Sequence, residues 1–91
     1  MCIVVNKYKS QFDVYIGRGS KWGNPFIIGK DGNRQEVIYK FKALLWESIK
    51  AGSITLEDLK ELHGKRLGCF CKPLPCHGDV IKDAVKWAMS Q

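Results

Sequence analysis

The stretch LGCFCKPLPCHGDV, at Leu67–Val80, decides the fold, because it joins a predicted strand to a predicted helix through a turn rich in cysteine and proline. The short apolar run that leads into Cys69 is typical of a strand. The apolar spacing that follows Asp79 is typical of an amphipathic helix. α/β proteins usually present their chemistry where a strand ends and a helix begins. The sequence therefore predicts an α/β fold with a functional site at this turn.

The length, composition and charge of the chain limit the classes of protein to which it can belong. Its 91 residues predict a single domain spanning residues 1–91. The apolar runs fall short of the roughly 20 residues of a membrane span, and the N-terminus lacks a signal peptide. We therefore expect a cytoplasmic protein without a membrane partner, in which clustered cysteines favour metal binding or catalysis over disulfides. The formal net charge of +6 favours anionic partners such as nucleotides, nucleic acid or phosphate.

The order of the predicted elements indicates one small layered domain. The predicted strands are residues 2–5, 13–16, 26–28 and 66–70. One helix opens at Asn33, with Glu36 in capping-box spacing, a second opens at Thr55, and a third follows the Cys/His turn to about Met89. We expect a three- to four-stranded mixed sheet flanked by three helices. The first and last strands should be parallel neighbours in its middle, because their connection is long enough for a crossover.

A second polar loop, GRGSKWGNP at residues 17–25, combines a permissive backbone with polar and aromatic side chains. Its glycines allow a close backbone approach to a ligand. Arg18 and Lys21 suit phosphate, and Trp22 suits stacking on a base, although Trp22 also fits the role of a hydrophobic plug. The loop is neither a Walker loop nor a Rossmann fingerprint. The side chains that it offers to a ligand are Arg18, Ser20, Lys21, Trp22 and Asn24.

The Cys/His turn permits three kinds of chemistry, of which anion binding is the first. Unpaired N–H groups around Gly78 and Asp79, at the start of the last helix, suit a phosphate or another anion. Asp79 either caps that helix or accepts hydrogen bonds from a ribose hydroxyl or a base. The candidate ligand-binding residues of the turn are Cys69, Cys71, Cys76, His77, Gly78 and Asp79.

Catalysis and metal binding are the alternatives at the same turn. A thiol at the start of a helix has a lowered pKa, so Cys76, or else Cys71, is a candidate nucleophile with His77 as its acid/base. The resulting enzyme would act on a nucleotide or nucleoside. The candidate zinc ligands are Cys69, Cys71, Cys76 and His77. Their spacing differs from that of paired zinc knuckles, so the leading interpretation includes no cofactor and the zinc-stabilised nucleic-acid-binding module is a further alternative.

The two motifs resemble those of domain-of-unknown-function family 4326, which comprises small uncharacterised proteins of phages and bacteria. The resemblance covers essentially the whole chain. It implies a small intracellular α/β protein, often of viral origin, but the family name supplies no activity. The family context and the two loops together motivate the hypothesis that such a protein sequesters or processes a host nucleotide, including a defence signal. The matching residues are Gly17, Arg18, Trp22, Gly23, Asn24 and Pro25 in the first motif and Cys69, Cys71, Pro73, Cys76, His77 and Asp79 in the second.

The leading hypothesis is therefore a binding protein for an anionic, nucleotide-derived small molecule. The ligand would lie in a pocket formed by the loop at residues 17–25 and the Cys/His turn at residues 69–79. If the protein is phage-encoded, this binding would take place in the host cytoplasm. The small size of the chain and the helix-borne Trp46 and Trp87 also predict a homodimer.

Overall fold

The helices and strands follow the predicted α/β order. The computed structural model describes residues 3–9, 11–17, 19–69 and 76–91. The elements within these ranges are β1 (Ile3–Asn6), β2 (Val14–Tyr15), α1 (Arg34–Ala51), α2 (Leu56–Lys60), β3 (Arg66–Cys69) and α3 (Gly78–Met89). The predicted α/β class and the three predicted helices are confirmed.

The three described strands form one parallel sheet in the order β1-β3-β2. Val4 of β1 and Val14 of β2 both pair with Leu67 of the central strand, β3. The predicted parallel pairing of the first and last strands is confirmed. Two other predictions were wrong. The first strand, β1, lies at an edge of the sheet and not in its middle, and the described strands form a parallel sheet and not a mixed one.

The predicted strand at residues 26–28 is also wrong. The only pairing described there is an isolated bridge between Ile28 and Gly32. The backbone turns back on itself instead, because Gly29 N–H donates to the Gly32 carbonyl at 2.8 Å and Ile27 N–H donates to the Asp31 carboxylate at 2.8 Å. A run of three apolar residues is too short to distinguish a strand from such a turn.

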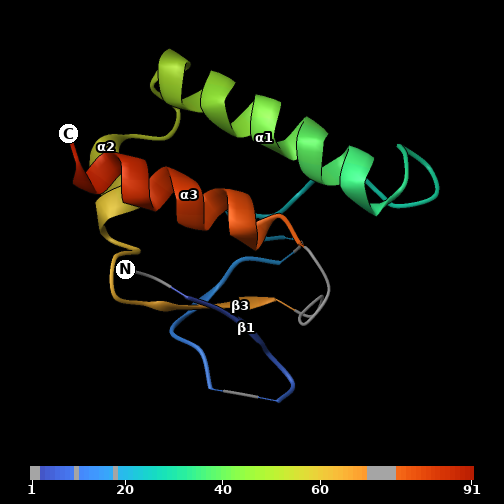
Figure 1. Cartoon of the computed structure of the whole chain (residues 1–91), viewed down its shortest axis with the longest axis horizontal. Coiled ribbons are helices and arrows are strands. Elements are labelled where there is room, and N and C mark those ends of the chain that lie inside the picture. The colour runs from blue at the N-terminus through green and yellow to red at the C-terminus, as the bar shows by residue number, and fades with distance from the viewer. Residues whose placement is uncertain (1–2, 10, 18, 70–75) are drawn as a thin grey trace.

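The described helices lie on one face of the sheet (Figure 1), where α3 packs against β1 and both α1 and α2 pack against α3. Side chains alternate along each strand, so Val4, Val14 and Leu67 face the helices and contribute to the core. On the opposite face Ile3 remains 49 % exposed, and the Phe12 ring lies over Gly68. The described residues thus form two layers, with all the described helices on one face of the sheet.

Local signals explain where the helices begin and end. Asn33 caps α1 by accepting a hydrogen bond from Glu36 N–H at 2.9 Å, and the Glu36 carboxylate accepts one from Asn33 N–H at 2.9 Å. Gly52 ends α1 in the left-handed conformation, with φ of 87°. Thr55 and Asp58 form the same reciprocal cap on α2. Within the described ranges we find no helix that has both the length and the apolarity to cross a bilayer.

An ion pair on the edge of the sheet fixes β2 to the start of β3. The Asp13 carboxylate accepts from the Arg66 guanidinium and from Arg66 N–H, at 3.1 and 2.8 Å. These hydrogen bonds lower the pKa of Asp13 to about 2. In return, Asp13 N–H donates to the Arg66 carbonyl at 2.8 Å, which sets the register of this very short strand.

Candidate ligand-binding site

The carboxyl ends of all three strands lie at the same edge of the sheet. β1 ends at Asn6, β2 at Tyr15 and β3 at Cys69, and the strands run in the same direction. β2 and β3 are neighbours, so the loop after β2 leaves the sheet beside the end of β3. Ligands of open α/β sheets bind outside this edge, and a ligand site here stays a prediction.

His77 joins these two segments directly. Its Nε2 lies 2.7 Å from the carbonyl oxygen of Ile16, the residue that follows β2. Because a carbonyl only accepts, Nε2 carries the proton in this contact. The ring is 8 % exposed and packs edge-on against Phe41 of α1, with centroids 5.0 Å apart. His77 thus holds the loop after β2 against the start of α3.

The first turn of α3 packs closely on the sheet. Gly78 is buried, and a Cβ at this position would lie 2.8 Å from Ile16 Cδ1 and 2.9 Å from Val4 Cγ1. Asp79 caps the turn, because its carboxylate accepts a hydrogen bond from Cys76 N–H at 3.3 Å. The capping role predicted for Asp79 is therefore present. The prediction of an unpaired N–H group at Asp79 is wrong, because Asp79 N–H donates to the Cys76 carbonyl at 3.1 Å. The next N–H group, that of Val80, donates to the His77 carbonyl at 3.0 Å.

Cys69 and Cys76 form a buried thiol pair between the end of β3 and the start of α3. Their sulfur atoms are 3.1 Å apart, and both residues are at most 2 % exposed. The hydrogen bond with Cys69, followed by burial, raises the pKa of the Cys76 thiol far above its ordinary value of 9.0. A thiol that stays protonated at neutral pH is a poor nucleophile, so this geometry favours a packing role for Cys76.

We expect Cys76 to resist alkylation in the folded protein. Because only the thiolate reacts, iodoacetamide at pH 8 should modify Cys76 at least about 100-fold more slowly in the folded protein than in urea. Peptide mass spectrometry after timed quenching measures this ratio for Cys76 separately from the other cysteines. A folded-state rate close to the rate in urea would show that Cys76 is exposed and ionised, as a catalytic nucleophile requires.

Hydrogen bonds and packing within the protein occupy the described side chains of the loop at residues 19–25. Ser20 Oγ donates to the Gly17 carbonyl at 2.6 Å. Asn24 Nδ2 donates to the Val37 carbonyl at 3.1 Å, and Asn24 Oδ1 accepts from Phe26 N–H at 2.9 Å. Ser20 and Asn24 therefore shape the loop and attach it to α1.

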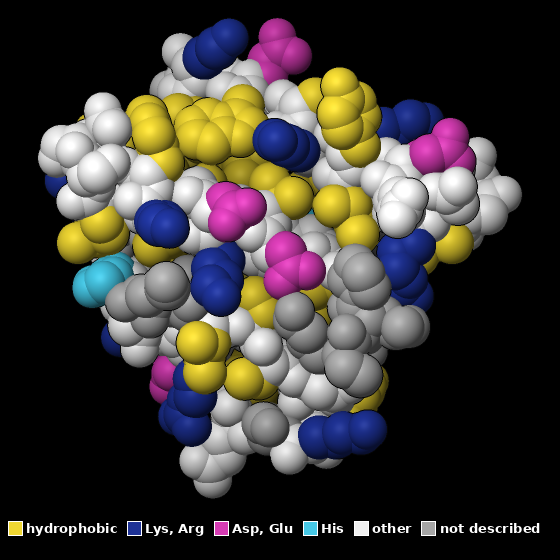
Figure 2. Space-filling view, in the orientation of Figure 1, with side chains coloured by type: hydrophobic (Ala, Val, Ile, Leu, Met, Phe, Trp, Pro, Cys, Tyr) yellow, Lys and Arg dark blue, Asp and Glu magenta, His cyan; other side chains and the backbone are white. Residues whose placement is uncertain are grey.

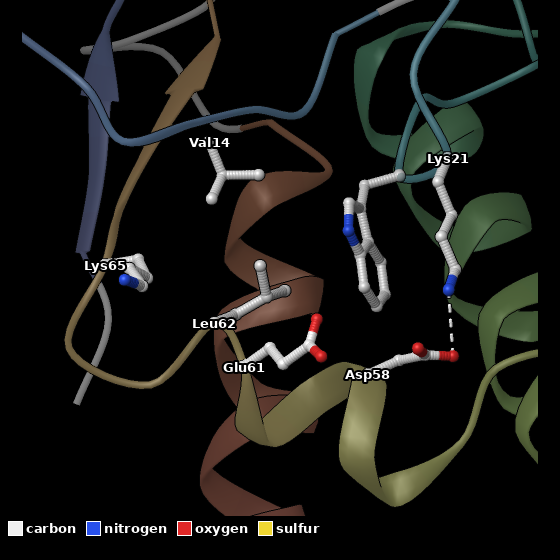
Figure 3. Close-up of a pocket in the computed structure, with 7 residues that line it drawn as sticks. Val14, Lys21, Asp58, Glu61, Leu62 and Lys65 are labelled. Carbon is white, nitrogen blue, oxygen red and sulfur yellow. Dashed lines mark ion pairs between the residues drawn. The ribbon is translucent and has the colours of Figure 1, made fainter.

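Lys21 points toward α2 (Figure 3), and both Lys21 and Trp22 line a cavity of about 410 Å³. Lys21 Nζ forms an ion pair with the Asp58 carboxylate at 2.9 Å. Trp22 is only 7 % exposed and belongs to the core cluster. Trp22 therefore fills space in the core, as the hydrophobic-plug alternative predicted. Its ring lines the cavity and is not free on the surface.

The cavity adds residues that sequence analysis missed. Val14 and Leu62 supply apolar walls, while Glu61 and Lys65 supply charges at its margin. The sequence carries no motif or spacing that singles out Glu61 or Lys65. Only the packing of α2 beside the glycine-rich loop brings them together with Trp22.

Two predicted site residues, Arg18 and Cys71, lie outside the described residues. Of the four candidate zinc ligands, Cys69, Cys76 and His77 are therefore the ones that the structure places. Among the residues that the structure describes, no three histidine, cysteine or acidic side chains are grouped closely enough to hold a metal ion.

Basic side chains do not form one block on the face shown in Figure 2. Lysine and arginine side chains are scattered there, with acidic side chains among them. Nucleic acids usually bind along a continuous basic stripe, which this face does not show.

Comparison with known proteins identifies the family. A family model described as Domain of unknown function (DUF4326) matches residues 4–87. The chain belongs to this family. It is 55 % identical over 86 residues to an uncharacterised 12.4 kDa protein from the nrdA-td intergenic region of Enterobacteria phage T4, covering 93 % of this chain and 78 % of that protein. No solved structure matches the chain significantly.

A second relative of this DUF4326 chain is also viral. It is an uncharacterised protein of Acanthamoeba polyphaga mimivirus, 33 % identical over 87 residues, covering 76 % of this chain and 63 % of that protein. The predicted resemblance to the family is confirmed, and both relatives agree with the small viral proteins that the resemblance implied. Their names assign no activity.

Proposed function

We propose that the protein binds an anionic, nucleotide-derived small molecule at the carboxyl edge of its sheet. The observation that carries this proposal is the contact between His77 Nε2 and the Ile16 carbonyl, which holds the loop at residues 17–25 beside the start of α3. The ligand would lie between these two segments, with Arg18 and Lys21 neutralising its phosphate. The net charge of +6 favours an anion.

Binding without turnover is better supported than catalysis. The Cys76 thiol is buried and hydrogen-bonded to Cys69, and its raised pKa keeps it protonated. His77 uses Nε2 to hold Ile16, which limits its freedom as an acid or base. The viral relatives motivate the further proposal that the protein sequesters a host nucleotide, including a defence signal.

The test is native mass spectrometry of the protein purified from cells, followed by denaturation and mass analysis of the released ligand. We expect a nucleotide-sized adduct that is recovered unchanged. Arg18→Ala should weaken the binding of that nucleotide about tenfold or more, because a charge-assisted hydrogen bond is lost. Lys86→Ala is the matched control, because Lys86 is exposed at the far end of α3.

Three results would contradict this proposal in different ways. Recovery of a chemically converted nucleotide would favour the enzyme. A zinc-sized increment that disappears with a chelator would favour the zinc-stabilised module. Protein that carries no bound ligand, and that binds none of a panel of nucleotides, would show that its ligand is not a nucleotide.

The same spectrum tests the predicted homodimer. The sheet face opposite the described helices carries Ile3 and Phe12, which are 49 % and 39 % exposed. Parallel sheets are normally covered on both faces, so a second copy packed against this face would complete the layer. A dimer mass supports this assembly, and a monomer mass at micromolar concentration contradicts it.

A further inference from the structure

The cavity beside α2 is lined by charged side chains of two kinds, some paired with each other and some without a described partner. Lys21 and Asp58 pair with each other at 2.9 Å, and Asp58 also accepts from Thr55 N–H at 3.0 Å. Within the described part of the chain, by contrast, the side chains of Glu61 and Lys65 make no hydrogen bond or ion pair. Their charges remain available to a ligand.

The indole of Trp22 adds a third available group. Its ring is 7 % exposed, and its N–H donates no hydrogen bond to any residue that the structure describes. The same ring, together with Val14 and Leu62, gives the cavity apolar walls. The volume of about 410 Å³ lies within the range of small-molecule sites. The cavity therefore combines apolar walls with one acceptor, Glu61, and two donors, Lys65 and Trp22.

This combination matches one nucleobase better than the others. Guanine presents two adjacent donors, N1–H and the N2 amino group, which a single carboxylate can accept together. The neighbouring O6 is an acceptor, suited to an ammonium or an indole N–H. Adenine and cytosine each place a ring acceptor beside their amino group, so the same carboxylate would meet a lone pair. Uracil offers one N–H between two carbonyl oxygens.

We propose that this cavity holds the guanine base of a guanine nucleotide, with Glu61 accepting from N1–H and N2 and with Lys65 or Trp22 donating to O6. This inference rests on the proposed function, because Trp22, which borders the cavity, belongs to the loop at residues 17–25. The base would then lie against α2.

The test compares four mononucleotides, GMP, AMP, CMP and UMP, by isothermal titration calorimetry. The wild-type protein should bind GMP at least about tenfold more tightly than AMP, because a site whose polar groups are left unpaired rejects the wrong base. Glu61→Gln should weaken GMP binding about tenfold and leave AMP binding unchanged. Glu57→Gln, one turn earlier on the same helix and outside the cavity, is the matched control and should behave as wild type.

The outcomes separate this inference from the proposed function. Equal affinity for all four nucleotides, or a guanine preference that survives Glu61→Gln, would overturn the guanine site while leaving nucleotide binding intact. Failure of all four to bind would overturn the proposed function as well. Because Glu61 is exposed and its side chain makes no described contact, Glu61→Gln should fold normally, which circular dichroism checks.

Discussion

Replacing His77 with alanine is expected to lower the free energy of unfolding by roughly 2–4 kcal/mol. The Ile16 carbonyl would lose its buried donor, which costs about 1–3 kcal/mol. The edge-on contact with Phe41 would be lost as well, at about 0.5–1.5 kcal/mol. Urea denaturation followed by circular dichroism measures the change.

His63→Ala is the control, because His63 is exposed and lies in the turn between α2 and β3. It should change the free energy of unfolding by less than about 0.5 kcal/mol. If His77→Ala is as stable as His63→Ala, the contact with Ile16 does not hold the two segments together. In that case the proposed ligand site loses its structural basis.

Replacing Gly78 with valine is expected to have a similarly large effect, a loss of roughly 2–4 kcal/mol in the free energy of unfolding. A Cβ at this position would lie within 2.9 Å of both Ile16 and Val4, whose side chains pack in the core. Overpacking of this kind typically costs about 1–3 kcal/mol, and the two additional methyl groups of valine increase the conflict. Chemical denaturation again provides the measurement.

Lys86→Val separates the packing conflict from helix propensity, because it introduces the same side chain on the exposed face of α3. Its cost should stay below about 1 kcal/mol. Gly78→Ala should lie between the two, since alanine adds a smaller conflict and favours the helix. A Gly78→Val protein as stable as Lys86→Val would show that α3 does not pack closely on β1 and the residue after β2.

The helices could be predicted because their signals are local. Asn33 and Glu36 form the expected cap, Gly52 ends the same helix, and Thr55 opens the next one. The pairing of β1 with β3 followed from the length of the connection between them. Each of these predictions depends on residues close in sequence or on a general rule of topology.

The position of each strand in the sheet could not be predicted in the same way. Nothing in the sequence of β1 distinguishes an edge strand from a central one, and β2 is fixed in part by the distant pair of Asp13 and Arg66. The error at residues 26–28 has a local cause, because the Asp31 carboxylate stabilises a turn that apolar residues alone do not reveal. In both places a hydrogen bond to a side chain, which hydrophobic periodicity does not reveal, fixes the backbone.

The candidate site, like the fold, could be predicted only in part. The sequence predicted that the two polar segments meet, and His77 joins them. It left open whether Trp22 is buried or stacks on a ligand, and it could not predict that Lys21 pairs with Asp58 or that Glu61 borders the same cavity. These features depend on where α2 packs, which its five residues do not encode alone.

The most direct measurement of nucleotide binding at the carboxyl edge is a ¹H–¹⁵N correlation spectrum of the labelled protein during titration with GMP. We predict saturable shifts concentrated at residues 17–25 and 76–79, with a further group around Glu61. A spectrum that stays unchanged at millimolar GMP, or saturable shifts confined to the exposed face of α1 around Tyr39, would contradict this account.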